Sequence, residues 1–431
     1  MNYQRTSKTL FLPSIILGIC GMIGAGIAGE PKSILFFSLI PAALWCFACF
    51  NKGFNWKRDA GVLLMLAALF VPRMVSLPLA FGDYKGFLLP WFERFKDQSF
   101  SQSMQRPVTN YMVLYEYFIY LISRLPYVPL ELYKLFSISF EALLAWACGK
   151  LACREREDRR CFYPAFLVTL ALPTVFLNSA VWAQCDVIYT ALALAGFSCF
   201  LEDHPYAGSI LFSMAFGCKL QSIFLFPILL VLMQKRKCTV RHMLILAASF
   251  AVICLPALAG GRTLQQIINT YVGQMGEHSQ EMVLSAPTVF QFINGDSQWD
   301  LTTLGSLGIS AAFSVMAVIV YLAIRSGKRG EIKGAFLLCI CIPFLLPHMH
   351  ERYFFLAEAL SIPIAAGKKR GKILVPALQI ISMKGYLESL FEVRTVLPWA
   401  LFSIGMGLIC TVGIYFLYQE GQAEKGWEQH E

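Results

Sequence analysis

Residues 335–366 read AFLLCICIPFLLPHMHERYFFLAEALSIPIAA. Two apolar runs in this stretch, Ala335–Pro347 and Phe354–Ala366, are separated by the polar cluster His348–Tyr353. A charged side chain inside a bilayer costs at least ~2.5–3.5 kcal/mol, so membrane segments avoid one that has no function. We therefore expect two membrane helices whose connection lies at a membrane surface or lines a polar cavity.

The rest of the chain has the same character. Of its 431 residues, 57% are hydrophobic and 15% are charged, whereas soluble domains carry about 25% charged residues. Many apolar runs approach the ~20 residues that an α-helix needs to span a ~30 Å hydrocarbon core. The composition therefore predicts an all-α polytopic membrane protein, with residues 1–431 in a single integral membrane domain.

The apolar runs predict the positions of the spans. Twelve are clear, at roughly 9–29, 33–51, 60–80, 133–150, 161–181, 186–202, 241–259, 304–325, 333–347, 353–366, 373–391 and 396–418. The fourteen cysteines lie mostly within apolar runs, where they behave as small hydrophobes. We therefore expect neither a disulfide framework nor a cysteine metal site.

The net charge of +9 comes largely from short loops between the runs, which is a topology signal rather than a nucleic-acid footprint. Loops rich in Lys and Arg are expected to be cytoplasmic. Six loops qualify: the N-terminus with Arg5 and Lys8, 51–59, 150–160, 235–242, 325–333 and 367–372. Both termini are then cytoplasmic, and we expect no nucleic-acid partner.

Loop charge also decides two ambiguous segments. Residues 111–124, YMVLYEYFIYLISR, would place the basic loop 150–160 outside if they crossed, so we interpret them as an amphipathic helix in the outer interface. Residues 204–234 begin and end at cytoplasmic loops, so we expect two short helices near 206–217 and 222–234 that meet on the outer side. The bundle then has about 12–14 crossings, and 14 on this count.

Two long loops, 81–132 and 260–303, fall on the extracytoplasmic side and are expected to carry amphipathic helices. The polar clusters within or beside apolar runs face that same side. These clusters are Gly82-Asp83-Tyr84, Trp182–Asp186, Lys219–Gln221, Glu277-His278 and His348–Tyr353. Because the topology rests on loop Lys and Arg residues, the convergence of the clusters on one face indicates a shared site.

Most of these clusters also have a plain structural interpretation. Asp83 could be a turn acid after glycine, or a carboxylate at the membrane edge whose partial desolvation suits proton abstraction. Asp186 could cap the following helix, and Trp182 could be an interfacial anchor. Lys219 and Arg73 could be snorkelling cations at helix ends or contacts for a phosphate or a sugar.

The cluster His348–Tyr353 is the strongest signal. Two histidines followed by a glutamate could bind Zn or Mn, but no HExxH helix and no third clustered histidine accompany them. Imidazole and guanidinium groups also suit a phosphate, since Arg offers a planar fork of donors. We therefore prefer phosphate recognition by His348, His350 and Arg352, and we expect no metal and no cofactor.

Five ordered stretches resemble those of the GT-C glycosyltransferases, polytopic enzymes that use polyprenyl-phosphate-linked sugars. They are GDYKGFLLPW at 82–91, TNYMVLYEYF at 109–118, WAQCDVIYTALAL at 182–194, KLQSIFLFP at 219–227 and HMHERYFFLAEAL at 348–360. The nearest similarity is to bacterial membrane proteins related to the GPI mannosyltransferase II, and a more distant one is to the dolichyl-phosphate-glucose glucosyltransferases. Met112-Val113 departs from the prolines frequent in that region, and no second acid stands beside Asp83.

The resemblance implies an enzyme of the plasma membrane that moves one hexose, such as mannose, from a polyprenyl-phosphate donor to a glycan or lipid-linked acceptor outside the cell. It implies that Asp83 is the general base or positions the acceptor, and that His350 and Arg352 contact the donor phosphate. Further candidates are Lys219 and His348 at the phosphate, and Gln184, Asp186, Gln221, Tyr84 and Glu351 at the sugar or acceptor. The open alternatives are a transporter or flippase of lipid-linked sugars and a surface-glycan polymerase or ligase.

Overall fold

The computed structural model describes residues 32–276, 281–293, 300–327, 330–367 and 369–428. The predicted span 9–29, the basic N-terminus and the pair Glu277-His278 lie outside the described residues. The same holds for parts of two predicted basic loops, at 328–329 and 368.

Helices account for nearly all regular structure in the described part of the chain. The α-helices are α2 (Lys32–Phe50), α3 (Trp56–Val75), α4 (Leu89–Lys96), α5 (Phe100–Met104), α6 (Val113–Ile122), α7 (Pro129–Arg156), α8 (Phe162–Ala171), α9 (Pro173–Phe176), α10 (Asp186–Leu201), α11 (Pro205–Cys218), α12 (Ile228–Gln234), α13 (Val240–Ala259), α14 (Leu264–Gly276), α15 (Leu301–Arg325), α16 (Gly330–Leu345), α17 (Phe355–Gly367), α18 (Leu374–Ser389) and α19 (Trp399–Glu428).

Shorter elements lie between these helices. The π-helical turns are η1 (Tyr84–Leu88) and η3 (Leu177–Val181). The 3₁₀ helices are η2 (Arg159–Cys161), η4 (Leu220–Leu225), η5 (Val289–Phe292), η7 (Glu351–Phe354) and η8 (Lys369–Ile373). Two-residue strands β1 (Val283–Leu284) and β2 (Met349–His350) pair in parallel, with Val283 opposite Met349.

The predicted spans that fall within the described residues are helical over most of their length. Four helices there have the length and apolar composition to cross a membrane by themselves: Pro129–Arg156, Val240–Ala259, Leu301–Arg325 and Trp399–Ala423. The pair Arg159–Ala171 and Pro173–Val181, bent by 56°, makes a fifth if it is one broken span. The predicted fold class, an all-α polytopic membrane protein, is thus confirmed, while the count of 12–14 crossings stays a prediction.

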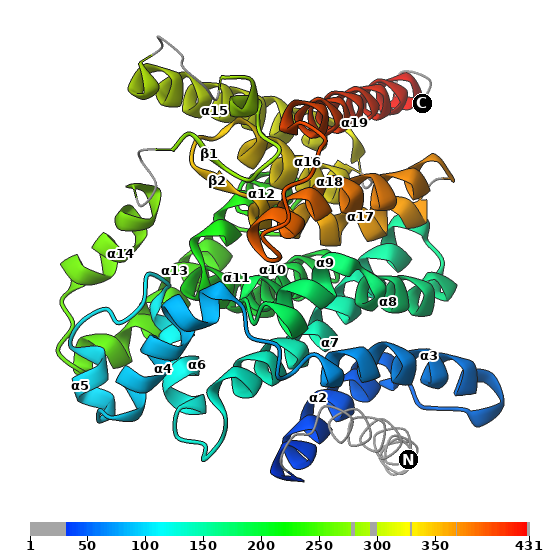
Figure 1. Ribbon diagram of the computed structural model, residues 1–431. Coiled ribbons are helices and arrows are strands. Elements are labelled where there is room, and N and C mark those ends of the chain that lie inside the picture. Colours follow the sequence, from blue (N-terminus) through cyan, green and yellow to red (C-terminus); the bar gives the residue numbers. More distant parts are fainter. Residues whose placement is uncertain (1–31, 277–280, 294–299, 328–329, 368, 429–431) are drawn as a thin grey trace.

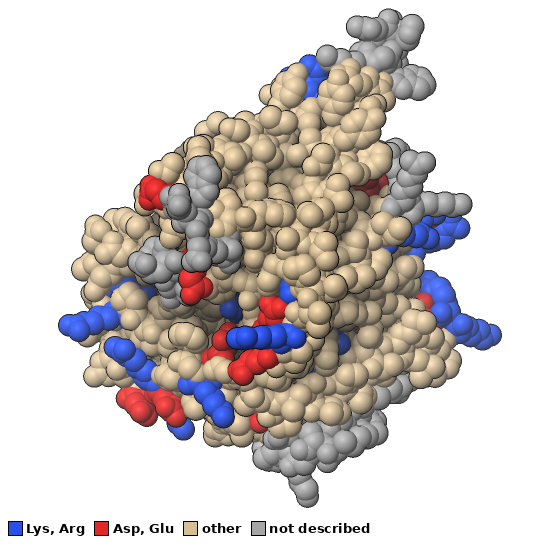
Figure 2. Space-filling model, turned by 45° about the horizontal axis from the view of Figure 1, so that its top comes forward, with Lys and Arg blue, Asp and Glu red and all other residues tan. Residues whose placement is uncertain are grey.

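Side chains on the outer helices fit a lipid environment. Large apolar residues such as Leu244 on α13, Phe313 on α15 and Leu408 on α19 are exposed. Most charged side chains on the face shown in Figure 2 lie low or at its right-hand edge, and the broad upper part is nearly free of them. An extended apolar surface without charge is what contact with lipid tails requires.

The centre of the molecule is formed by α7 and α10. Helix α7 contacts α2, α8, α10 and α17, and α10 packs between α7 and α11. Almost every side chain of α10 from Val187 to Leu201 is buried, as expected for a helix that is apolar all round. In Figure 1, α2 and α3 lie below this centre, and α15, α16 and α19 lie above it.

The segment between α10 and α13 crosses the bundle and returns. Lys237 Nζ lies 2.7 Å from Asp203 Oδ1, so the two ends of the segment meet. The middle of the segment, Lys219, lies 2.6 Å from Asp186 at the opposite end of α10. The chain is extended at Lys219 between α11 and η4. The predicted break is therefore present in the structure, while the two membrane crossings of this segment stay a prediction.

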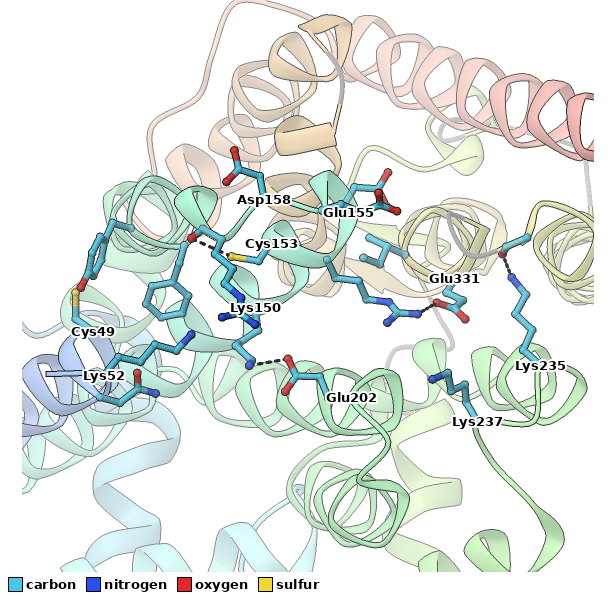
Figure 3. Close-up of a pocket in the computed structure, with 18 of the residues that line it drawn as sticks. Cys49, Lys52, Lys150, Cys153, Glu155, Asp158, Glu202, Lys235, Lys237 and Glu331 are labelled. Atoms are coloured by element: carbon cyan, nitrogen blue, oxygen red, sulfur yellow. Dashed lines mark hydrogen bonds and ion pairs between the residues drawn. The ribbon is translucent and has the colours of Figure 1, made fainter. Parts of the chain in front are cut away.

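Basic loops gather at one end of the bundle, which we call the basic end. They surround a cavity of about 1300 Å³ (Figure 3), and Gly367 at the end of α17 lies against Glu155 there. Cations from four of the predicted cytoplasmic loops line the cavity: Lys52, Arg58, Lys150, Arg154, Arg159, Lys235, Lys237 and Arg325. The loops thus share one face, and the assignment of that face to the cytoplasm stays a prediction.

The two long predicted outer loops, 81–132 and 260–303, contact each other away from the basic end. Helices α4, α5 and α6 of the first loop and α14 of the second lie at the left of Figure 1. Arg262 Nη1 lies 2.7 Å from Glu116 Oε2, and both side chains are buried. Arg262 also donates to the carbonyl oxygens of Met104 and Arg106. At ten residues, or about 15 Å, α6 is too short to span a bilayer.

Candidate active site

Asp83 lies between the end of α3 and the π-helical turn η1. The segment that leads to it is fixed by Lys134 of α7, whose Nζ donates to the carbonyl oxygens of Ser76 at 2.7 Å and Leu79 at 2.6 Å. The Asp83 side chain is 31% exposed to solvent. Its Oδ2 accepts a hydrogen bond from Gln184 Nε2 at 2.7 Å. A partly exposed carboxylate is thus held in place by an amide.

Gln184 is presented by an unusual stretch of backbone. The π-helical turn η3 precedes it, and Ala183 has a left-handed φ of 62° although it is not glycine. The Gln184 N–H donates to the Asn178 carbonyl at 2.8 Å, and Ser137 Oγ donates to the Gln184 carbonyl at 3.0 Å. π-helical turns and strained φ values concentrate at functional sites. Here both place one amide beside Asp83.

Arg352 approaches Asp83 from the 3₁₀ helix η7. Its Nη1 lies 3.7 Å from Asp83 Oδ2, its Nε lies 3.2 Å from Glu351 Oε1, and its guanidinium sits 4.5 Å from the ring centre of Trp182. Burial disfavours the charged form, but Tyr111 and the nearby carboxylates outweigh it and keep the pKa of Arg352 well above its ordinary value. Nη1 is buried and has no hydrogen-bond partner among the described residues, so this donor of a permanent cation is not satisfied by a hydrogen bond there.

Asp186 and Lys219 form a buried ion pair beside this group. The Lys219 Nζ to Asp186 Oδ1 distance is 2.6 Å, and Asn178 Nδ2 donates to Asp186 Oδ2 at 3.0 Å. Asn178 Nδ2 also donates to the Tyr386 hydroxyl at 3.3 Å. Helix α10 begins at Asp186, whose carboxylate is bonded by the side chains of Asn178 and Lys219. The structure therefore pairs two residues that the sequence predicted as separate ligand contacts.

Aromatic rings enclose the Lys219 ammonium. Its Nζ lies 5.1 Å from the ring centre of Tyr111, with Tyr189 and Tyr353 slightly farther away. Tyr111 also donates from its hydroxyl to Gln184 Oε1 at 3.4 Å. Burial raises the pKa of Tyr111 well above its ordinary value, so the hydroxyl keeps its proton. Tyr111 thus links the Asp83–Gln184 contact to the buried ion pair.

The histidine cluster contacts the second long loop. The His348 backbone is left-handed with a φ of 59°, its N–H donates to the Met282 carbonyl, and its ring Nδ1 lies 2.6 Å from the Glu281 carbonyl oxygen. His350 packs its ring against Tyr353. These contacts direct His348 to the loop.

Glu351 connects the histidine cluster to Arg352. Its Oε2 lies 3.7 Å from His350 Nδ1, and its Oε1 lies beside Arg352 Nε. Burial alone would raise the pKa of Glu351, but His350 and Arg352 outweigh it and lower that pKa. Glu351 is therefore ionised at neutral pH.

The remaining candidate residues, Gln221, Tyr84 and Arg73, do not share one environment. Gln221 is buried on η4, and its Oε1 has no hydrogen-bond partner among the described residues. Tyr84 is half-buried, and burial together with the charge of Glu131 raises its pKa. Arg73 lies apart from the cluster, in a buried ion pair with Glu141 at 2.7 Å. In the described part of the chain, no three His, Cys, Asp or Glu side chains converge as a metal site would need.

Sequence patterns did not identify three residues that complete the cluster: Tyr111, Asn178 and Tyr386. Asn178 and Tyr386 lie inside apolar runs, and a polar residue within such a run is itself a signal of function. Tyr111 lies in a segment interpreted as interfacial. Trp182, for which an interfacial anchor was one of two interpretations, is buried against Arg352.

Comparison with known families now adds independent information. Residues 117–348 match glycosyltransferase family 87, and this range is more than half of the 431 residues. It contains Gln184, Asp186, Lys219 and Gln221, whereas Asp83 and Arg352 lie outside it. No curated protein matches the chain significantly. The match supports a glycosyltransferase in general and does not single out the mannosyltransferase II-like proteins. The chain belongs to glycosyltransferase family 87.

Proposed function

We propose that this membrane protein is an inverting GT-C-type hexosyltransferase that uses a polyprenyl-phosphate-linked sugar, such as a mannosyl donor, on the extracytoplasmic face. The acceptor is a glycan or a lipid-linked sugar. The observation that carries the proposal is the pairing of Asp83 with Arg352, a partly exposed carboxylate 3.7 Å from a guanidinium whose Nη1 makes no hydrogen bond among the described residues. A base and an anion-binding group side by side are what this displacement needs.

The chemistry follows from the two groups. Asp83 accepts the proton of the acceptor hydroxyl as that oxygen attacks the anomeric carbon of the donor. The bond between that carbon and the phosphate oxygen breaks, and its electron pair leaves with the lipid phosphate. Arg352 and His350 stabilise the negative charge that develops there. One displacement with one base inverts the anomeric centre.

Gln184 and the buried pair support this arrangement. Gln184 Nε2 holds Asp83 Oδ2 and thereby aims the second carboxylate oxygen at the acceptor. Lys219 is bonded to Asp186 and only 2% exposed, so we assign the pair a positioning role beneath the sugar. The unpartnered Oε1 of Gln221 can accept a hydrogen bond from a donor hydroxyl.

Membership in a glycosyltransferase family favours a transferase over the transporter alternative. A direct test uses the purified full chain in lipid nanodiscs with radiolabelled mannose on a polyprenyl phosphate, on a polyprenyl pyrophosphate or on a nucleotide. Methyl hexosides serve as acceptors, with and without a chelator. We expect transfer from the lipid monophosphate that the chelator does not change. Transfer from the nucleotide sugar instead, or complete loss on chelation, would contradict the proposal.

A further inference from the structure

A polar hollow of about 350 Å³ adjoins the proposed catalytic cluster. Its size is at the small end of ligand pockets, ~300–1,000 Å³. The polar and aromatic residues of its lining include Glu281, Gln291, His350, Glu351, Ser389 and Trp399. We infer that this hollow binds the saccharide of the acceptor, a neutral polyhydroxylated group. The inference rests on the proposed transfer reaction and assigns its acceptor subsite.

The charge of the lining distinguishes a sugar from a phosphate. Two carboxylates, Glu281 and Glu351, line the hollow, and within the described residues no Lys or Arg does. Carboxylates accept hydrogen bonds from hydroxyl groups and repel anions. Arg352, one position along the chain, offers the cation. The lipid phosphate is thereby directed to Arg352 and the saccharide to the hollow.

On one side of the hollow, a glycine of α18 allows close packing against the segments that carry Glu351 and Ser285. Strand β1 of the second long loop pairs with β2 beside His350. A Cβ added to Gly385 of α18 would collide with the Glu351 side chain and lie 2.9 Å from the Ser285 carbonyl oxygen. Gly385 therefore allows α18 to approach both segments. The wall on this side is set by close packing.

Another part of the lining is the indole of Trp399, whose orientation is fixed by its contacts. Trp399, at the start of α19, is half-buried and donates from Nε1 to Glu388 Oε2 at 2.8 Å. Lys384 Nζ lies 4.6 Å from its ring centre. These contacts fix the plane of the ring. An aromatic surface next to hydrogen-bonding groups suits a sugar, which has apolar C–H faces and polar edges.

Two contacts lead from the hollow to the proposed base. Glu351 Oε1 lies 3.2 Å from Arg352 Nε, and Arg352 Nη1 lies 3.7 Å from Asp83 Oδ2. A saccharide seated against Glu351 is thus beside the residue that binds the leaving phosphate.

The test measures equilibrium binding of three radiolabelled probes, methyl α-mannoside, methyl α-glucoside and methyl α-galactoside, to the full chain in nanodiscs. Ser389→Trp fills the hollow from an exposed position at the end of α18, so the fold tolerates it. We expect the variant to bind the preferred probe at least about tenfold more weakly, with the KM for the donor unchanged. The control Ser310→Trp, at an exposed serine of α15 outside the hollow, should bind it like the wild type.

Equal affinity in the wild type and Ser389→Trp would overturn the inference, as would no saturable binding of any probe to the wild type. Displacement of the bound probe by inorganic phosphate would also overturn it, because the site would then prefer an anion to a neutral saccharide. Probe binding that Ser389→Trp abolishes, in a protein that transfers no sugar, would support the hollow as a saccharide site and contradict the proposed reaction. The experiment therefore distinguishes failure of the saccharide site from failure of the proposed transfer reaction.

Discussion

Two lysine–carboxylate pairs at opposite ends of the bundle have nearly the same length and different surroundings. Lys219 Nζ lies 2.6 Å from Asp186, and the side chains are 2% and 0% exposed. Lys150 Nζ lies 2.7 Å from Glu202 at the basic end, and those side chains are 27% and 37% exposed. The distances are equivalent, so the two pairs differ in their surroundings, and above all in burial.

The difference separates two uses of charge in a membrane protein. An exposed pair contributes about 0–1 kcal/mol, because water and salt screen it. In a buried pair, removal of one partner leaves an uncompensated charge and costs about 3–5 kcal/mol. We therefore interpret the charges at the basic end as topology signals. Those around Asp83 fix the geometry of a site.

The largest expected effect comes from Asp83→Asn, which keeps the size of the side chain and removes the base. The initial rate of sugar transfer by the purified protein should fall by about 10²–10⁴-fold, the usual contribution of a general base. The thermal midpoint should stay near that of the wild type, because Asp83 is partly exposed. Asp158→Asn at the basic end is the matched control and should transfer normally. Near-normal transfer by Asp83→Asn would refute its role as base.

Lys219→Met should have the next largest effect, on stability. The substitution leaves Asp186 charged, buried and without its ammonium partner, which costs about 3–5 kcal/mol. The thermal unfolding midpoint in nanodiscs should drop clearly. The double variant Lys219→Met with Asp186→Leu removes both charges and should recover part of the loss. A single variant as stable as the wild type would mean that the pair contributes little to the fold.

The sequence and the structure agree most where the signal is repeated along the chain. Apolar runs predicted the helices, because length and hydrophobicity are local properties. Loop charge predicted that the basic loops share one end and the polar clusters another, and the break at Lys219 followed from the same count of crossings. These predictions needed no knowledge of how helices pack.

The contacts within the site could not be predicted in that way. Lys219 and Asp186 are 33 positions apart, and Asn178 and Tyr386 are 208 positions apart. Whether such groups bond to each other or to a ligand depends on how η3, α10, α11 and α18 pack, which no local pattern encodes. The sequence thus indicated the chemistry of the site better than the partner of each group.

Arg352→Lys tests the guanidinium donor Nη1. Lysine keeps the charge but loses the planar fork that contacts Glu351, Asp83 and a phosphate together. The rate of transfer should fall, by less than the ~10²–10³-fold loss that removal of a whole donor causes. The KM for the lipid donor should rise with it. A variant with wild-type kinetics would show that Arg352 does not meet the phosphate.

Lys150→Met should have the smallest effect. It breaks the exposed pair with Glu202, so stability should change by less than about 1 kcal/mol and transfer should be unchanged. The same thermal and kinetic measurements apply. A loss of stability as large as that of Lys219→Met would show that the exposed and the buried ion pair contribute equally to the fold.

The proposed reaction is a single displacement assisted by Asp83, and the configuration of the product at its anomeric carbon tests this most directly. NMR of the purified product, compared with a donor of known configuration, gives the answer in one measurement. The proposed reaction predicts inversion, because one attack by the acceptor oxygen replaces the phosphate from the opposite face. Retention of configuration would require a second displacement through a nucleophile and would contradict this mechanism.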